Sequence, residues 1–120
     1  MEKLTIQEEE AMQAVWKIGA GGLKTILSQV GAPKPPYTTL ASTIKNLEKK
    51  KFVSGTLVGN AYLYRALVSE EEYKKKFVGG FVKDYFDNSY KEMVNFFVAQ
   101  KKISARELQE IMIMIEGKKV

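Results

Sequence analysis

The chain has 120 residues, of which 45% are hydrophobic, and its 19 basic and 14 acidic residues give a formal net charge of +5. This length suits one compact domain, and the positive charge favours an anionic partner, although lysine also keeps proteins soluble. The absence of cysteine and histidine excludes disulfides, thiolate nucleophiles, imidazole bases and nearly every zinc or copper site.

The first residues, MEKLTIQEEE, lack the basic end and apolar run of a secretory signal. No apolar segment reaches the roughly 18 residues that a membrane-spanning helix needs, so we expect a cytoplasmic protein without membrane insertion. Thr5 and Glu8 form a capping-box pattern, which predicts a helix from about Ile6 to Ile18. The glycines of residues 19–22 should end it.

Two further helices are predicted before residue 52. Apolar residues recur at helical spacing between Leu23 and Val30, and Gly31 is placed to end that helix in a left-handed conformation. Three prolines among residues 33–36 then favour an extended connection. The third helix should begin at Tyr37 and continue to about Lys51, with its apolar face formed by Leu40, Ile44 and Leu47.

The amino-acid composition changes after Lys51. The segments FVSGTLV and AYLYRAL are rich in strand-forming residues and are separated by Gly59 and Asn60, which predicts a two-stranded hairpin with a tight turn. Three helices followed by a hairpin is the order of a winged helix-turn-helix. We therefore predict a mainly α protein with a winged-helix domain in residues 1–68.

Residues 69–120 are predicted to form three more helices, because capping-box pairs recur at Ser69, Ser89 and Ser104. An aromatic stripe on the first of them could line a ligand pocket, but such stripes are more often core or interface. About fifty residues provide little core of their own, so we expect a second copy of the chain to cover this region, giving a homodimer. The residues expected to mediate dimerisation are Tyr73, Phe77, Phe81, Tyr85, Phe97, Leu108, Ile111, Met112 and Ile115.

The third helix exposes many hydroxyl and amide side chains, although such residues are mediocre helix formers. One interpretation is a recognition helix in the major groove of DNA, where threonine offers a hydroxyl to a base edge and a methyl to thymine. The other is an ordinary solvated helix face, and the adjoining hairpin and lysines favour DNA. The candidate DNA-binding residues are Thr38, Thr39, Ser42, Thr43, Lys45, Asn46, Lys49 and Lys50 on the helix, and Asn60 and Arg65 on the hairpin.

Catalysis is not indicated by any motif. Glu70, Glu71 and Glu72 lie at a helix start, where negative charge is favoured for structural reasons. The glycines of residues 19–22 lack the lysine and hydroxyl context of a phosphate-binding loop, and we expect no cofactor or metal. The main alternative to a DNA-binding protein is a winged-helix protein-interaction module without specific DNA binding.

The order and spacing of several segments resemble the penicillinase repressor family, the dimeric winged-helix repressors of β-lactamase and methicillin-resistance genes. The resemblance extends from about Leu4 to Glu116 and rests on the following segments: EEEAMQAVWK, YTTLASTIKNLEKKKFV, AYLYRALVSEEEY, EMVNFFV and ISARELQEI. It implies a homodimer on a palindromic operator, with residues 1–68 reading DNA and residues 69–120 dimerising.

In that family, a membrane-bound sensor's signal leads to proteolytic cleavage of the repressor at an Asn-Phe bond. Asn95 and Phe96 form such a pair, and a gapless comparison places the family's bond one residue later. The resemblance thus implies a sensor-linked protease as a partner. Thr38, Asn46 and Asn60 stand where family members often carry basic residues, which implies a different operator.

Overall fold

The computed structural model describes residues 2–117, apart from the side chains of residue 112 and residues 114–117. The chain forms two compact units that meet within one helix, the first ending at Lys76 and the second beginning at Phe77. The predicted fold class is confirmed: helices dominate, with a small antiparallel sheet in the first unit.

Three helices and the sheet make up most of the first unit. Helix α1 covers Ile6–Ile18, α2 covers Leu23–Gln29 and α3 covers Tyr37–Lys49. The capping box predicted at the start of α1 is present. The Glu8 amide donates to the Thr5 hydroxyl at 3.1 Å, and the Thr5 amide donates to the Glu8 carboxylate at 2.8 Å.

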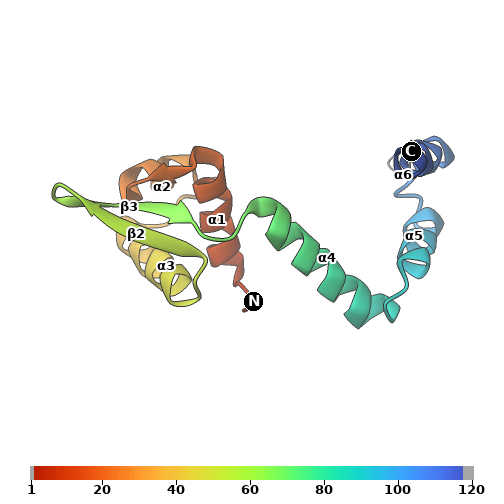
Figure 1. The fold of residues 1–120 in the computed structure, drawn as a ribbon, viewed down its shortest axis with the longest axis horizontal. Helices are drawn as coiled ribbons and strands as arrows, with labels where there is room; N and C mark the ends of the chain where they lie inside the picture. Colours follow the sequence, from red (N-terminus) through yellow and green to blue (C-terminus); the bar gives the residue numbers. More distant parts are fainter. Residues whose placement is uncertain (1, 118–120) are drawn as a thin grey trace. The chain divides into compact units, whose positions relative to one another are not determined.

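The predicted hairpin consists of β2 (Val53–Val58) and β3 (Ala61–Ala66), which pair antiparallel and extend past the helices of this unit (Figure 1). Gly59 takes the first position of the two-residue turn with a φ of 62°, where a type II′ turn needs glycine. A short strand that the sequence did not predict, β1 (Ala20–Gly21), pairs with β3 and gives the sheet order β1-β3-β2. Two residues are too few to show a strand pattern in a sequence.

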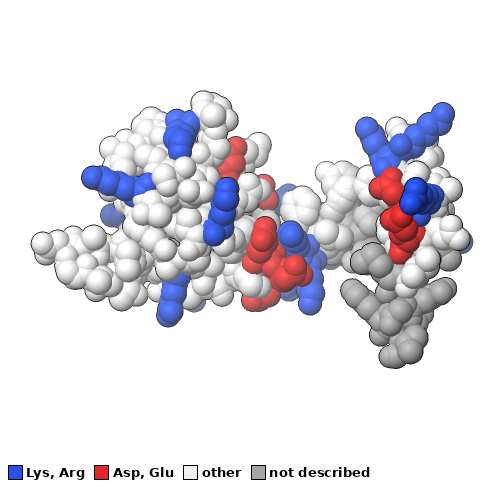
Figure 2. Space-filling view, turned by 90° about the horizontal axis from the view of Figure 1, so that it is seen from above, with Lys and Arg blue, Asp and Glu red and all other residues white. Residues whose placement is uncertain are grey.

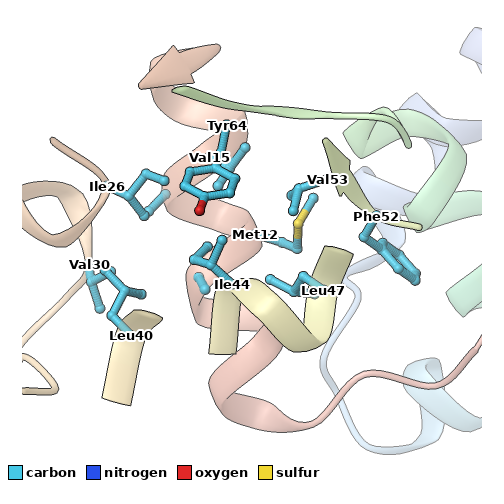
Figure 3. Close-up of a cluster of buried hydrophobic side chains, with 12 residues drawn as sticks. Met12, Val15, Ile26, Val30, Leu40, Ile44, Leu47, Phe52, Val53 and Tyr64 are labelled. Carbon is cyan, nitrogen blue, oxygen red and sulfur yellow. The ribbon is translucent and has the colours of Figure 1, made fainter. Parts of the chain in front are cut away.

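The core of the first unit lies between the helices and the sheet (Figure 3). Met12 and Val15 of α1 are fully buried together with residues of α2, α3 and the start of β2. Strand alternation places Tyr64 on the face of β3 that meets this core, where it is 7% exposed. The other core residues that Figure 3 labels are Ile26, Val30, Leu40, Ile44, Leu47, Phe52 and Val53.

The ends of α2 and α3 differ from the prediction. Helix α2 ends at Gln29, and Val30 is already extended with a φ of −73° and a ψ of 138°, so the left-handed cap predicted at Gly31 is wrong. Helix α3 ends in a left-handed residue instead: Lys51 has a φ of 65°. A residue with a Cβ atom in this conformation costs about 1 to 2 kcal/mol.

Helix α4 (Glu70–Phe86) begins in the first unit and continues into the second, which also holds α5 (Tyr90–Ala99) and α6 (Ala105–Gly117). The three predicted serine caps are present, since the amides of Glu72, Glu92 and Glu107 each donate to the serine three residues earlier at 3.1 Å. Among the described residues, no helix is long and apolar enough to cross a membrane.

Candidate nucleic-acid interface

One side of α3 is open to solvent along its whole length. Residues 38, 42, 45 and 49 follow one another at steps of three or four, and residues 39 and 46 lie beside them, so all six share one face. All six are exposed, and within the described part of the chain their side chains make no hydrogen bond or ion pair. The face combines hydroxyls, an amide and ammonium groups: Thr38, Thr39, Ser42, Lys45, Asn46 and Lys49.

Thr43 does not belong to this face, so its predicted outward position is wrong. It is 8% exposed, and its hydroxyl donates to the backbone carbonyl of Thr39 at 3.0 Å. The reason is helical geometry: consecutive residues are about 100° apart, which places position 43 about 40° from Leu47, at the border of the buried arc. We therefore remove Thr43 from the candidate interface.

Lys50 turns away from the exposed face of α3 and binds the start of α1. Its ammonium lies 2.7 Å from the Glu8 carboxylate and donates to the Lys3 carbonyl at 3.0 Å. Burial alone would raise the pKa of Glu8, but hydrogen bonds from Lys50 and Thr5 and the charge of Lys50 hold that pKa below its ordinary value. Lys50 thus joins α1 to the end of α3, and its predicted contact with DNA stays a prediction.

The hairpin contributes little positive charge. Asn60 is exposed at the turn, and the end of the hairpin carries no charged side chain on the face that Figure 2 shows. Arg65 is exposed, but it alternates with Tyr64 along β3 and so lies on the sheet face opposite the core. The structure does not bring Arg65 together with the exposed face of α3.

The charge near the base of the hairpin is partly negative. Burial raises the pKa of the Tyr64 hydroxyl, and the nearby Glu48 carboxylate, exposed on α3, raises it further. Glu48 would repel a phosphate group that approached this side of α3. The exposed face of α3 is therefore the strongest candidate for contact with an anionic polymer.

Lys51 was not among the predicted site residues, although it belongs to the run of three lysines that closes α3. It directly follows α3 and Lys50 and is exposed. The sequence did carry a signal at this position. Helices often end in a left-handed residue, which is usually glycine, and here the helix is followed by a third lysine instead. A lysine there is unusual.

Tyr73 was predicted to mediate dimerisation, but it belongs to the first unit and packs on the other residues of that unit. Its ring lies 5.5 Å from that of Trp16 and 6.0 Å from that of Phe52, and its hydroxyl donates to the Glu9 carboxylate. Burial and this hydrogen bond raise the pKa of Tyr73. The Trp16 indole also donates to the Val68 carbonyl at 2.8 Å, so the start of α4 is fixed to α1.

The second unit leaves much apolar surface uncovered. Val82 is its one fully buried side chain among those described, whereas Phe77 is 58% exposed and Tyr85 is 77% exposed. Of the other predicted dimerisation residues, Ile111 is exposed and Phe81, Phe97 and Leu108 are half-buried. The side chains of Met112 and Ile115 lie outside the described residues.

The predicted cleavage pair lies on α5, where both Asn95 and Phe96 are exposed. Cleavage stays a prediction. Within residues 2–117, as far as their side chains are described, there is no group of three or more acidic residues that could hold a metal ion.

Three helices, a β-hairpin and an open polar face on the third helix define the class of winged helix-turn-helix DNA-binding proteins. The model of the penicillinase repressor family matches residues 4–117, and the chain belongs to this family. It is a DNA-binding transcriptional repressor. No curated protein matches the chain.

A solved structure of Bordetella bronchiseptica BpsR is similar in fold, with 14% sequence identity and a TM-score of 0.49. The match covers 98% of this chain and 76% of that one. In that protein DNA binding is regulated by 6-hydroxynicotinic acid.

Proposed function

We propose that this repressor acts as a homodimer on a palindromic operator, with one α3 helix of each subunit in the major groove. Two such helices would enter successive grooves about one helical turn apart, roughly 34 Å. The proposal is carried by the exposed face of α3, whose polar side chains have no partner among the described residues. Membership of the penicillinase repressor family supports it.

The residue types on this face suggest a division of roles. Thr38, Thr39, Ser42 and Asn46 would contact base edges, since hydroxyls and amides can both donate and accept hydrogen bonds there. Lys45 and Lys49 would contact phosphates, as would Asn60 or Arg65 if the DNA reaches the hairpin.

The second unit supports the homodimer. Aromatic side chains such as Phe77, Tyr85 and Phe96 are about half exposed or more, and exposed apolar surface of this kind marks an interaction site. A second copy of the same surface would cover it through a two-fold axis, the symmetry that a palindromic site requires. Residues 69–120 would therefore dimerise and residues 1–68 would bind DNA.

We further propose that the repressed genes are of the antibiotic-resistance type and that the bound dimer blocks access of RNA polymerase. Family membership supports this regulatory role. In that setting, cleavage between Asn95 and Phe96 by a sensor-linked protease would separate parts of the second unit. Both residues are exposed on α5, which suits access by a protease.

The test is a gel shift with the region upstream of the chain's own gene, in competition with a shuffled duplex of the same composition. Thr39→Ala and Ser42→Ala should reduce the preference for the upstream duplex by about 5- to 100-fold, the effect of losing one base contact. Binding to the shuffled duplex should change little. Gln13→Ala, on an exposed position of α1, is the matched control and should leave both affinities unchanged.

Equal losses on both duplexes would contradict base reading by Thr39 and Ser42. Binding of the unaltered protein to both duplexes with the same affinity would instead indicate an architectural role. Absence of binding to any duplex would leave the protein-interaction module as the remaining interpretation.

A further inference from the structure

Lys51 occupies a backbone conformation that a lysine adopts only at a cost. Its amide donates to the Glu48 carbonyl at 3.0 Å, and the Phe52 amide donates to the Leu47 carbonyl at 2.9 Å. This pair of bonds is a Schellman motif, in which the left-handed position usually belongs to glycine. Leu47 and Phe52 are both buried, so core contacts on each side of Lys51 favour this conformation.

The fold gains little from a lysine at this position. The Lys51 side chain is exposed, and among the described residues its ammonium has no hydrogen-bond or ion-pair partner. A cation near a helix C-terminus interacts favourably with the helix dipole, but Lys49 and Lys50 already place two ammonium groups there. A strained backbone conformation that does not stabilise the fold is a reason to look for a functional role of the residue.

The position of Lys51 matches what a phosphate contact requires. In helix-turn-helix domains the N-terminal residues of the recognition helix contact the bases, and in the homeodomain variant the C-terminal end of that helix contacts the DNA backbone. Lys51 directly follows that end, and Lys49 lies on the exposed face one turn from Lys45. Lys50 between them is held by Glu8 at 2.7 Å, so Lys51 is the next available cation.

We propose that Lys51, together with Lys49, binds DNA phosphates at the C-terminal end of α3, and that Lys50 does not. This inference rests on the proposed function, because it assigns a further contact residue to the same interface. It also accounts for the lysine in the left-handed position: the ammonium improves DNA affinity at the expense of the stability of the fold.

The second unit provides a matched control at Lys101. Lys101 also has a left-handed φ of 58°, its amide donates to the Val98 carbonyl, and the Lys102 amide donates to the Phe97 carbonyl. Lys101 is thus a lysine in the same motif but at the end of α5. Strain by itself does not identify a DNA contact, and the position beside α3 distinguishes Lys51.

The experiment measures binding to the upstream duplex and to a shuffled duplex across a range of salt concentrations. Lys51→Asn removes the charge with a residue that accepts the left-handed conformation. It should weaken binding to both duplexes and reduce the slope of log K against log salt by about 0.9 for each subunit bound. Lys51→Arg should retain the slope, and Lys101→Asn should leave both slope and affinity unchanged.

Thermal denaturation provides a second and independent readout. Lys51→Gly should raise Tm by a few degrees while it lowers DNA affinity, and a change that simply disrupted the fold would lower both. Lys101→Gly should relieve the same backbone strain without any loss of affinity. Opposite signs for stability and binding in the Lys51 variants are the expected result.

An unchanged salt slope in Lys51→Asn would overturn the proposal, as would an equal loss of slope in Lys101→Asn. Lys49→Ala shows whether the proposed function survives such a result. If Lys49→Ala reduces the slope and Lys51→Asn does not, only the assignment of Lys51 fails. If the unaltered protein binds neither duplex, the proposed function fails as well.

Discussion

The two units of this chain differ in how completely they bury their own apolar residues. In the first unit, side chains from all three helices and from the sheet are almost fully buried around Met12 and Ile44. In the described part of the second unit, Val82 alone reaches that degree of burial, and Phe77, Tyr85 and Ile113 are more than half exposed.

This difference indicates that the units reach stability by different routes. The first has a core of its own, so its fold should not depend on protein concentration. The second has helices with good caps but few buried contacts, and most helical stability in proteins comes from packing rather than from propensity. The homodimer proposed above would supply the contacts that the second unit lacks.

The largest expected effect is in the core of the first unit. Phe52 is 1% exposed, and Phe52→Ala should cost about 3 to 5 kcal/mol of unfolding free energy because it leaves a cavity. Urea denaturation followed by the fluorescence of Trp16, the chain's one tryptophan, measures the first unit selectively. Phe96→Ala, on the half-exposed Phe96 of α5, is the control and should leave this transition unchanged. Equal effects would mean that the two units do not fold independently.

The next effect concerns association. Tyr85 is 77% exposed in the single chain, and Tyr85→Ser should raise the dimer dissociation constant about 30-fold, or about 2 kcal/mol, if this ring is central to the interface. Sedimentation equilibrium measures that constant. Tyr62→Ser, on the hairpin tyrosine that is 54% exposed, is the matched control. If neither variant changes the constant, Tyr85 lies outside the interface.

A smaller effect on the free energy of unfolding is expected from the ion pairs, and it should differ between the two units. Glu8→Gln breaks a pair whose Glu8 side chain is 5% exposed and should cost about 1 to 2 kcal/mol. Glu110→Gln breaks a pair with Arg106 in which both side chains are exposed, and should cost less than about 0.5 kcal/mol. Chemical denaturation at pH 7 gives both values. A comparable cost for the two variants would contradict the difference in burial.

The ion pair between Glu8 and Lys50 also predicts how the stability of the fold changes with pH. Folding lowers the pKa of Glu8 below its ordinary value of 4.5, so the carboxylate stabilises the folded state at neutral pH. That contribution should be lost as pH falls through the folded-state pKa, because the folded form must then take up a proton. Denaturation at a series of pH values below 4.5 should show a shallower decline for Glu8→Gln. An identical decline would exclude Glu8 as the titrating group.

Much of the first unit could be predicted from its sequence. The start of α1 at Ile6 follows from the Thr5 capping box, and the turn of the hairpin follows from Gly59 and Asn60. Such signals are local: a cap or a turn depends on two to four neighbouring residues. β1 was missed because its two residues pair with β3 through the backbone alone.

The candidate site was predicted less completely, because side-chain direction depends on the packed structure. Helical spacing placed Ser42 and Lys49 on the exposed face, but Thr43 lies at the border of the buried arc, where spacing alone does not decide. The contact between Lys50 and Glu8 joins residues 42 positions apart. The same holds for Tyr73, whose partner Trp16 lies in a different part of the sequence, so no local pattern could reveal either contact.

The attachment of Tyr73 to Trp16 and Glu9 has a consequence for how repression would end. The proposed cut between Asn95 and Phe96 lies beyond Lys76, where the first unit ends, and removes nothing from its core. The fragment that holds α3 should therefore stay folded and still recognise one half-site. What it loses is the gain in avidity from two linked binding events, which can reach 10² to 10⁴ in affinity. Release from the operator would then be a matter of valency, with the DNA-reading surface itself intact.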